Sequence, residues 1–273
     1  MVIETTNFGF SSASKKSQVW VGTGWKMNML LDEAVVYSRT LRSYLQENPF
    51  PGNIFLVPPF TALSTVCKTV AESQILVGAQ NAHWEQGGAF TGEISCPMIA
   101  DCGATIVEIG HSERRRDFGE TDLTVNLKVL AAIRNNLCPL ICIGDSAVEK
   151  SKGDAKNVIK NQVLSAVKGI SPSESSSIIF AYEPVWAIGE GAQPASVEVV
   201  GEITSFVRQL LKNFFGSHYS GQIPVLYGGS VNIENAVSYL LHSEVDGLFI
   251  GRAAWKVEGF IKIIHALEGV IEK

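Results

Sequence analysis

Short apolar runs and longer amphipathic runs alternate along this chain of 273 residues, from Val19 to its C-terminal end. The apolar runs have the length and composition of strands, and they lie at 19–23, 53–57, 75–79, 104–109, 139–143, 178–182, 223–227 and 247–250. Helical spacing of apolar residues follows them, most clearly at 31–46, 122–135, 157–168, 195–215, 233–241 and 257–271, with shorter segments at 61–72 and 96–102. Eight such units in about 250 residues predict an α/β chain that folds as a single-domain (β/α)₈ barrel, because a doubly wound sheet usually needs fewer strands.

The composition excludes several classes of protein. A net charge of -5 gives no basic field for nucleic acid or for an anionic membrane surface, although a small anion site remains compatible with it. The five cysteines are odd in number and mostly lie in apolar contexts, which favours reduced thiols and a cytoplasmic location. No apolar run has the length of a membrane span. Residues 1–17 are expected to form a loose N-terminal extension, with a targeting segment as the alternative, and 18–273 the barrel domain.

Glu183 follows the sixth apolar run and precedes Pro184 and the glycine-bearing segment with Gly189 and Gly191. A carboxylate at the end of a buried strand is partly desolvated, which raises its pKa and makes it a better proton acceptor. The carboxyl ends of the strands build the active site of a (β/α)₈ barrel. Glu183 is therefore a candidate base, and a structural carboxylate closing the strand is the alternative.

Lys26 and His111 follow the first and fourth runs, so both are expected at the same end of the barrel. A lysine there would hold an anionic substrate, whereas a solvated surface lysine is the alternative. The charged turn after His111, which includes Glu113, could open a short helix, whose N-terminal dipole would favour the neutral imidazole. A neutral ring donates one hydrogen bond to a carbonyl oxygen. A structural histidine is the alternative.

Glycine-rich segments follow the last two runs. Gly228, Gly229 and Ser230 follow the seventh, and Gly251 and Arg252 follow the eighth. Loops at these places in a (β/α)₈ barrel commonly bind phosphate through backbone N–H groups and a hydroxyl. Ordinary turns are the alternative for each segment taken alone.

A cation, a neutral donor, a base and a phosphate clamp at one end of a barrel suit proton transfer beside the carbonyl of a small phosphorylated sugar. The sequence has no metal-binding signature and no dinucleotide glycine fingerprint. We therefore expect chemistry that needs no cofactor and no metal. The long irregular segment from Gln80 to Ser95 is expected to have a task of its own.

The chain resembles the triosephosphate isomerase family, the family of the TIM barrel, from about Val19 to its end. The matching runs, which follow the family's order and spacing, are Trp25-Lys26-Met27-Asn28, Val57-Pro58-Pro59-Phe60, Gly88-Ala89-Phe90-Thr91-Gly92-Glu93, Gly110-His111-Ser112-Glu113-Arg114-Arg115, Ala181-Tyr182-Glu183-Pro184-Val185-Trp186-Ala187-Ile188-Gly189 and Tyr227-Gly228-Gly229-Ser230-Val231-Asn232.

The resemblance implies the division of roles established for that family. Glu183 would be the base at carbon, His111 the electrophile at the carbonyl oxygen and Lys26 the group that stabilises the charge of the enediolate, with Glu113 supporting the lysine. This is the chemistry of a cofactor-free aldose–ketose isomerase, an intramolecular oxidoreductase.

The resemblance also implies where the substrate's phosphate and a second subunit bind. Gly189, Ser230 and Gly251 fall on the family's phosphate-binding positions, and 184–194 falls on the lid that closes over substrate. The segment from Gln80 to Ser95 falls on the loop that reaches into the second subunit of a homodimer.

Several residues depart from the family's pattern near the substrate. Gly24 stands where the family usually has asparagine, Arg252 replaces the second glycine of a pair, and Glu190 stands where threonine is common. The lid ends in Ala192-Gln193-Pro194 in place of Lys-Thr-Ala. A lost amide and a new guanidinium change the room and the charge around the phosphate, so the substrate cannot be assumed from the family.

Two substrates stay open on the sequence. The main reading is the conversion of dihydroxyacetone phosphate to D-glyceraldehyde 3-phosphate, as in glycolysis and gluconeogenesis. The departures, together with 81–84 and 250–255, also resemble a subfamily that converts L-erythrulose 1-phosphate to D-erythrulose 4-phosphate in erythritol breakdown. A non-catalytic sugar-phosphate-binding barrel and a different phosphate-binding barrel enzyme are further alternatives. The joint presence of Lys26, His111 and Glu183 argues against both.

Overall fold

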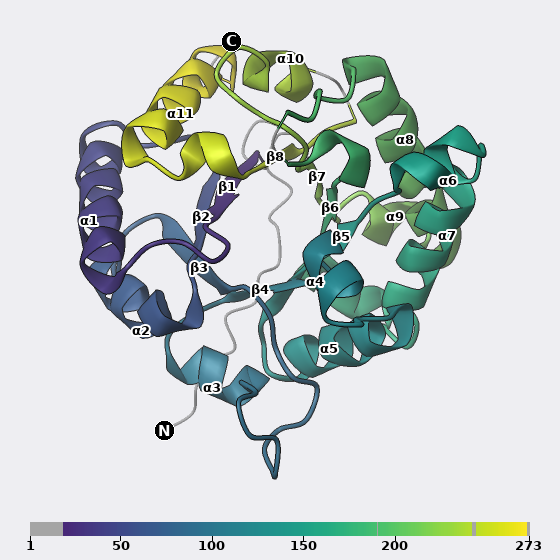
Figure 1. The fold of residues 1–273 in the computed structure, drawn as a ribbon, viewed down its shortest axis with the longest axis horizontal. Coiled ribbons are helices and arrows are strands. Elements are labelled where there is room, and N and C mark those ends of the chain that lie inside the picture. The colour runs from purple at the N-terminus through teal and green to yellow at the C-terminus, as the bar shows by residue number, and fades with distance from the viewer. Residues whose placement is uncertain (1–18, 190, 242–243, 272–273) are drawn as a thin grey trace.

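The eight predicted strands pair in parallel and in chain order to close a barrel (Figure 1). We describe residues 19–189, 191–241 and 244–271 of a computed structural model, so the predicted extension at 1–17 lies outside the described residues. The strands are β1 (Trp20–Gly24), β2 (Asn53–Val57), β3 (Ile75–Ala79), β4 (Ile106–Ile109), β5 (Cys138–Ile143), β6 (Ile179–Tyr182), β7 (Val225–Tyr227) and β8 (Gly247–Ile250). Pairing of β1 with β8, with Thr23 opposite Ile250, closes the barrel and confirms the predicted fold.

Helices surround the barrel on all sides (Figure 1). They are α1 (Leu31–Glu47), α2 (Phe60–Thr69), α3 (Cys96–Asp101), α4 (Ser112–Asp117), α5 (Asp122–Arg134), α6 (Ala147–Ser151), α7 (Ala155–Ala166), α8 (Val197–Phe215), α9 (Ser217–Ser220), α10 (Ala236–Leu240) and α11 (Val257–Ile271), with 3₁₀ turns η2 (Pro172–Ser177), η3 (Val185–Ala187) and η4 (Arg252–Ala254). The helix predicted at 233–241 begins only at Ala236. The side-chain oxygen of Asn235 accepts a hydrogen bond from the backbone N–H of Asn232, and that of Asn232 accepts from the N–H groups of Glu234 and Asn235. These hydrogen bonds hold the segment in a turn.

Side chains along each strand point alternately into the barrel and outward toward the helices, which divides the core into two layers. Inside the barrel, Phe55 and Phe249 stack with ring centroids 5.5 Å apart, and Gly22 leaves room for the Phe55 ring. Outward-pointing residues pack against the helices. On β4, Ile106 belongs to the interior layer and Val107 to the outer one, so Glu108 projects into the barrel interior.

The segment from Gln80 to Ser95 projects outward beyond α3 (Figure 1). At its base the N–H of His83 donates to the carbonyl oxygen of Ile94 over 2.8 Å, and the rings of His83 and Phe90 lie 4.4 Å apart. Residues 85–93 are exposed. In the described residues, none of the helices is long and apolar enough to cross a membrane.

Candidate active site

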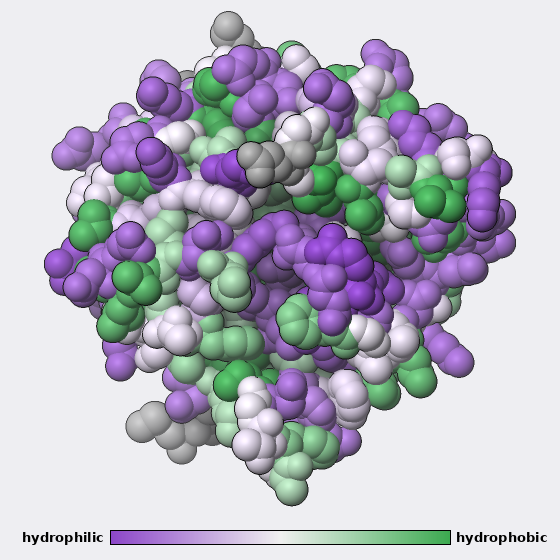
Figure 2. Space-filling view, viewed as in Figure 1, coloured by the Kyte–Doolittle hydropathy of each residue, from purple (hydrophilic) through white to green (hydrophobic). Residues whose placement is uncertain are grey.

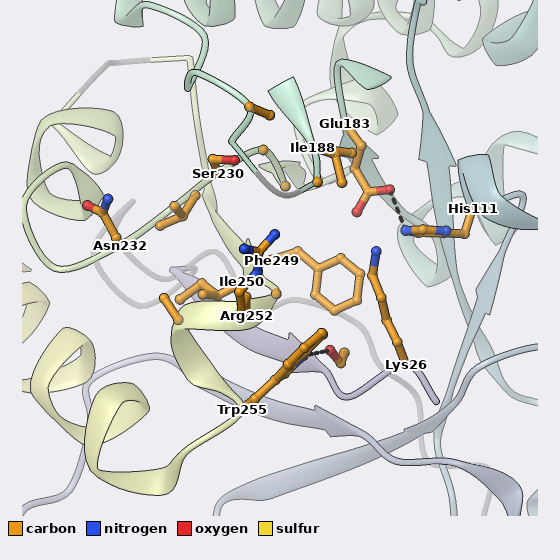
Figure 3. Close-up of a pocket in the computed structure, with 18 of the residues that line it drawn as sticks. Lys26, His111, Glu183, Ile188, Ser230, Asn232, Phe249, Ile250, Arg252 and Trp255 are labelled. Carbon is orange, nitrogen blue, oxygen red and sulfur yellow. Dashed lines mark hydrogen bonds and ion pairs between the residues drawn. The ribbon is translucent and has the colours of Figure 1, made fainter. Parts of the chain in front are cut away.

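A cavity of about 610 Å³ opens at the carboxyl ends of the strands (Figure 3). Hydrophilic residues gather around the middle of this face of the molecule (Figure 2). All residues that the sequence singled out for catalysis or substrate binding line it, namely Lys26, His111, Glu113, Glu183, Gly189, Ser230, Gly251 and Arg252. They come from the segments after β1, β4, β6, β7 and β8, so the closed barrel brings together residues that are far apart in sequence.

Glu183 directly follows β6 and is only 4% exposed. Burial raises the pKa of its carboxyl, and the nearby His111 and Lys26 oppose this shift. Its Oε2 atom is buried and has no hydrogen-bond partner among the described residues. Gly228 makes room for this carboxyl, because a Cβ there would lie 2.7 Å from Oε1. The site therefore holds a desolvated carboxylate that is free to accept a proton.

His111 caps the N-terminus of α4, as the sequence predicted. Its Nδ1 atom accepts a hydrogen bond of 3.1 Å from the backbone N–H of Glu113. A ring nitrogen that accepts a hydrogen bond carries no proton, so the proton of the neutral ring is on Nε2. Nε2 lies 3.5 Å from Oε2 of Glu183 (Figure 3). The cavity thus receives an N–H donor beside the carboxylate.

Lys26 points its ammonium toward Glu183 and His111 (Figure 3) and lies 2.6 Å from Oε1 of Glu113. Burial alone would raise the pKa of Glu113, but the hydrogen bond from Lys26 and the neighbouring positive charges lower it overall. The backbone of Lys26 is left-handed, with φ at +52°, a conformation that is costly for a side-chain-bearing residue. Gln80 secures this turn by donating to the carbonyl oxygen of Lys26 over 2.8 Å.

The segment after β7 presents backbone donors to the cavity. The N–H groups of Gly229 and Ser230 make no hydrogen bond within the described residues. The hydroxyl of Ser230 donates to the carbonyl oxygen of Ala187 over 2.7 Å, which ties this segment to the one after β6. Arg252 lines the same part of the cavity. Free N–H groups and a guanidinium form a site suited to a phosphate.

The segment that follows Glu183 is anchored at its start. Trp186 donates its ring N–H to Asp145 over 3.0 Å, and Tyr182 donates its hydroxyl to the other oxygen of the same carboxylate over 3.0 Å. Beyond the 3₁₀ turn, Gly189 has φ at +113°. Glu190 lies outside the described residues. These two hydrogen bonds to one carboxylate fix the start of the segment that follows Glu183.

Sequence reasoning missed three residues that line the cavity, namely Glu108, Phe249 and Trp255. Glu108 is a buried carboxyl on an inward position of β4, and Phe249 belongs to the interior layer on β8. Trp255 donates its ring N–H to the carbonyl oxygen of Gly24 over 3.1 Å. A lone carboxylate within an otherwise apolar strand was the available signal for Glu108. No group of three or more histidine, cysteine or acidic residues in the described ranges could hold a metal ion.

Comparisons with known proteins identify the family whose sequences and fold this chain resembles. A family model described as triosephosphate isomerase matches residues 19–267. A protein of Rhizobium etli named L-erythrulose-1-phosphate isomerase is 45% identical over 256 residues, which cover 93% of this chain and 94% of the relative. Proteins of the same name from Mesorhizobium japonicum and Mycolicibacterium smegmatis are each 45% identical over at least 91% of this chain and 98% and 93% of the relative. The crystal structure of triosephosphate isomerase from Bartonella henselae superposes with a TM-score of 0.83 at 32% identity, covering 92% of this chain and 99% of the other.

Proposed function

The chain belongs to the triosephosphate isomerase family, and we propose that it converts L-erythrulose 1-phosphate to D-erythrulose 4-phosphate. Between the two substrates that the sequence left open, the names of the three relatives described above favour the four-carbon one. The observation that carries the reaction is the meeting of a desolvated carboxylate and an imidazole N–H donor, 3.5 Å apart, beside the ammonium of Lys26.

The proposed reaction exchanges the places of a carbonyl and a neighbouring alcohol. In L-erythrulose 1-phosphate the carbonyl is at C2 and the adjacent C3 bears a hydroxyl and a hydroxymethyl group. Moving one proton from C3 to C2 and one from the C3 oxygen to the C2 oxygen gives the second ketose, whose numbering then runs from the other end. Removal of the C3 proton generates an enediolate, so the barrier depends on a base at carbon and on stabilisation of charge at oxygen.

Each step has a residue in position. Glu183 takes the proton from C3 and returns it to C2. The Nε2–H of His111 hydrogen-bonds the carbonyl oxygen at C2, gives its proton to that oxygen and takes the proton of the C3 hydroxyl in its place, while the ammonium of Lys26 stabilises the negative charge that develops on the enediolate oxygens. Glu113 holds that ammonium in place through the contact of 2.6 Å. These are the roles that the family resemblance implies.

We propose that the segments after β6, β7 and β8 bind the phosphate. We assign this role to Gly189, Ser230 and Gly251, with Arg252 adding a positive charge at the edge. The segment 184–194 would close over the bound substrate. Closure would exclude water from the enediolate and so limit the loss of phosphate from this intermediate.

Dihydroxyacetone phosphate and D-glyceraldehyde 3-phosphate are the second candidate substrate pair. They have the same phosphate and the same reacting oxygens with one carbon fewer, and a structure named triosephosphate isomerase superposes closely on this chain. The position that bears on the choice between the two pairs is Gly24, which lines the cavity without a side chain, next to Phe249 and Glu108.

The assembly that we propose is a homodimer in the cytoplasm, held by the projecting segment from Gln80 to Ser95. Its support is the exposure of residues 85–93 and of nearby apolar side chains, with Met27 96% exposed and Phe90 43% exposed. Light scattering after size-exclusion chromatography tests it. We expect the wild-type protein to be a dimer and a variant with residues 86–92 shortened to be a monomer. A wild-type monomer at micromolar concentration would contradict the assignment.

The reaction is tested by proton exchange. In ²H₂O, isomerisation of L-erythrulose 1-phosphate by the purified protein should place solvent deuterium on the product carbon that receives the proton, because a carboxylic acid exchanges its proton with solvent. Protein without activity on either sugar phosphate, but with binding of both, would favour the non-catalytic barrel instead.

A further inference from the structure

Glu108 is a carboxyl in a place where a (β/α)₈ barrel normally has an apolar side chain. It lies on an inward position of β4, in the layer that also contains Ile106, Cys142 and Phe249, and it is 7% exposed. Burying a carboxyl among apolar neighbours costs free energy unless its oxygens find partners. The roles proposed above for the site make no use of this residue.

The protein supplies hydrogen-bond partners for only part of the Glu108 carboxyl. Oε1 receives a weak hydrogen bond from the Cys142 thiol over 3.9 Å, and no other hydrogen bond or ion pair reaches the side chain from the described residues. Burial, and to a lesser degree the charge of Glu183, raises the pKa of Glu108 to about 7. Near neutral pH the group is therefore often protonated, and it can both donate and accept a hydrogen bond. Since Glu108 lines the cavity, a group bound in the cavity could use its unmet hydrogen-bonding capacity.

Gly24 lies beside this carboxyl and the Phe249 ring, and all three residues line the cavity. A Cβ on Gly24 would lie 3.8 Å from Oε2 of Glu108 and 3.0 Å from Cζ of Phe249. A larger side chain at position 24 would therefore fill this corner of the cavity. With glycine there, the corner is bounded by the Glu108 carboxyl on one side and the Phe249 ring on the other. The base Glu183 lines the same cavity, and its charge acts on Glu108.

The four-carbon substrate has a group that fits this corner. Relative to dihydroxyacetone phosphate, L-erythrulose 1-phosphate has one additional hydroxymethyl group, attached to the carbon that loses its proton. That group lies beside Glu183 and away from the phosphate. Glu108 on β4 is on the other side of the barrel from the phosphate-binding segment after β8, because three strands lie between β4 and β8 in either direction around the closed sheet.

We propose that Glu108 is a specificity-determining residue that hydrogen-bonds the terminal hydroxyl of the four-carbon sugar phosphate in the corner left open by Gly24. This inference rests on the proposed function and adds to it the group that selects the longer substrate. Each of the two residues has its own part: Gly24 supplies the room, and Glu108 supplies the polar contact that a hydroxyl needs when it leaves water.

The test measures binding, so that it does not depend on turnover. In a Glu183→Gln background, which removes the base, calorimetry gives dissociation constants for L-erythrulose 1-phosphate and for dihydroxyacetone phosphate. Adding Glu108→Leu should weaken binding of the four-carbon ligand by about tenfold or more and that of the three-carbon ligand by less than about threefold. Adding Glu108→Gln, whose amide still donates and accepts, should restore most of the difference.

Two controls make the result specific. Glu113→Gln removes another carboxyl that lines the cavity and should change binding of both ligands alike, because Glu113 acts through Lys26. Thermal unfolding of each variant reports whether the fold is intact, and leucine at an inward barrel position is expected to be tolerated. Equal weakening of both ligands by Glu108→Leu, or no change in either, would overturn the proposal.

Failure of the proposed function would look different. A wild-type protein that turned over only the triose phosphates would contradict the four-carbon assignment, while the ratio of dissociation constants would still report on Glu108. Conversely, the wild-type protein could be active on L-erythrulose 1-phosphate while Glu108→Leu leaves the ratio of the two dissociation constants unchanged. That result would support the proposed function and contradict the role proposed for Glu108.

Discussion

Nε2 of His111 lies 3.5 Å from Oε2 of Glu183, while Nδ1 of the same ring accepts a hydrogen bond from the backbone N–H of Glu113. The second contact fixes the tautomer, so the first places an N–H donor beside a base. A substrate between them would meet the donor at its carbonyl oxygen and the base at the neighbouring carbon. This arrangement serves proton transfer beside a carbonyl and gives each of the two groups one task.

Glu183→Gln is expected to lower kcat by about two to four orders of magnitude, because the amide is not a base under working conditions. Phosphate binding should persist, since the segment after β7 and Arg252 are untouched. Steady-state kinetics and the dissociation constant for inorganic phosphate are the measurements. A rate within threefold of wild type would rule out Glu183 as the base.

Gly228→Ala should displace the base without removing it. The new Cβ would lie 2.7 Å from Oε1 of Glu183, so the carboxylate must shift, and a displacement of about 1 Å costs about 10²-fold in rate. Gly269→Ala on α11 is the matched control, because nothing lies within 4 Å of its Cβ. That control should keep full activity and raise the free energy of unfolding by about 0.5–1 kcal/mol. Full activity in Gly228→Ala would contradict the packing argument.

The stability of the protein should depend on pH through Glu108. Burial raises its folded-state pKa from 4.5 to about 7, so the folded state binds this proton more tightly than the unfolded state. The stabilisation is fully present below pH 4.5 and is lost as the pH rises to about 7. The free energy of unfolding of the wild type, relative to Glu108→Leu, should therefore fall between those values. Urea denaturation at several pH values measures it, and a constant difference would show that the pKa of Glu108 is not raised in the folded protein.

Arg252→Gly should weaken the binding of both substrates to the same extent. The phosphate is attached next to the reacting carbons in the same way in the three-carbon and the four-carbon substrate, so a residue near the phosphate cannot distinguish them. Loss of the guanidinium should raise KM about tenfold on both with a smaller effect on kcat. A change confined to one substrate would mean that Arg252 contacts the sugar and not only the phosphate.

Much of this architecture could be predicted because strand ends converge in a (β/α)₈ barrel. Lys26, His111 and Glu183 are separated by more than 70 residues from one another, and their common place after apolar runs, together with the family resemblance, linked them. The predicted strand at 223–227 begins two residues later, at Val225. Pro224 has no N–H for a ladder, although its carbonyl oxygen still accepts from Phe180 over 2.9 Å.

Other features depend on how the barrel closes. Phe249 and Gly24 meet because β8 pairs with β1, with Phe249 opposite Gly22, and no local pattern encodes that register. The inward direction of Glu108 likewise follows from the strand's phase, which four residues of β4 do not reveal. Helices α4, α6 and α9 have six residues or fewer and are too short for a periodic signal. At α6, the capping box of Ser146 and Glu149 was the readable sign.

The most direct test is kcat/KM of the purified wild-type protein on L-erythrulose 1-phosphate and on D-glyceraldehyde 3-phosphate, measured side by side. A preference for the four-carbon substrate of more than about tenfold, which corresponds to about 1.4 kcal/mol of differential transition-state binding, is the predicted result. A preference of that size for the triose phosphate would contradict the four-carbon assignment and leave the enzyme a triosephosphate isomerase that tolerates Gly24 and Glu108.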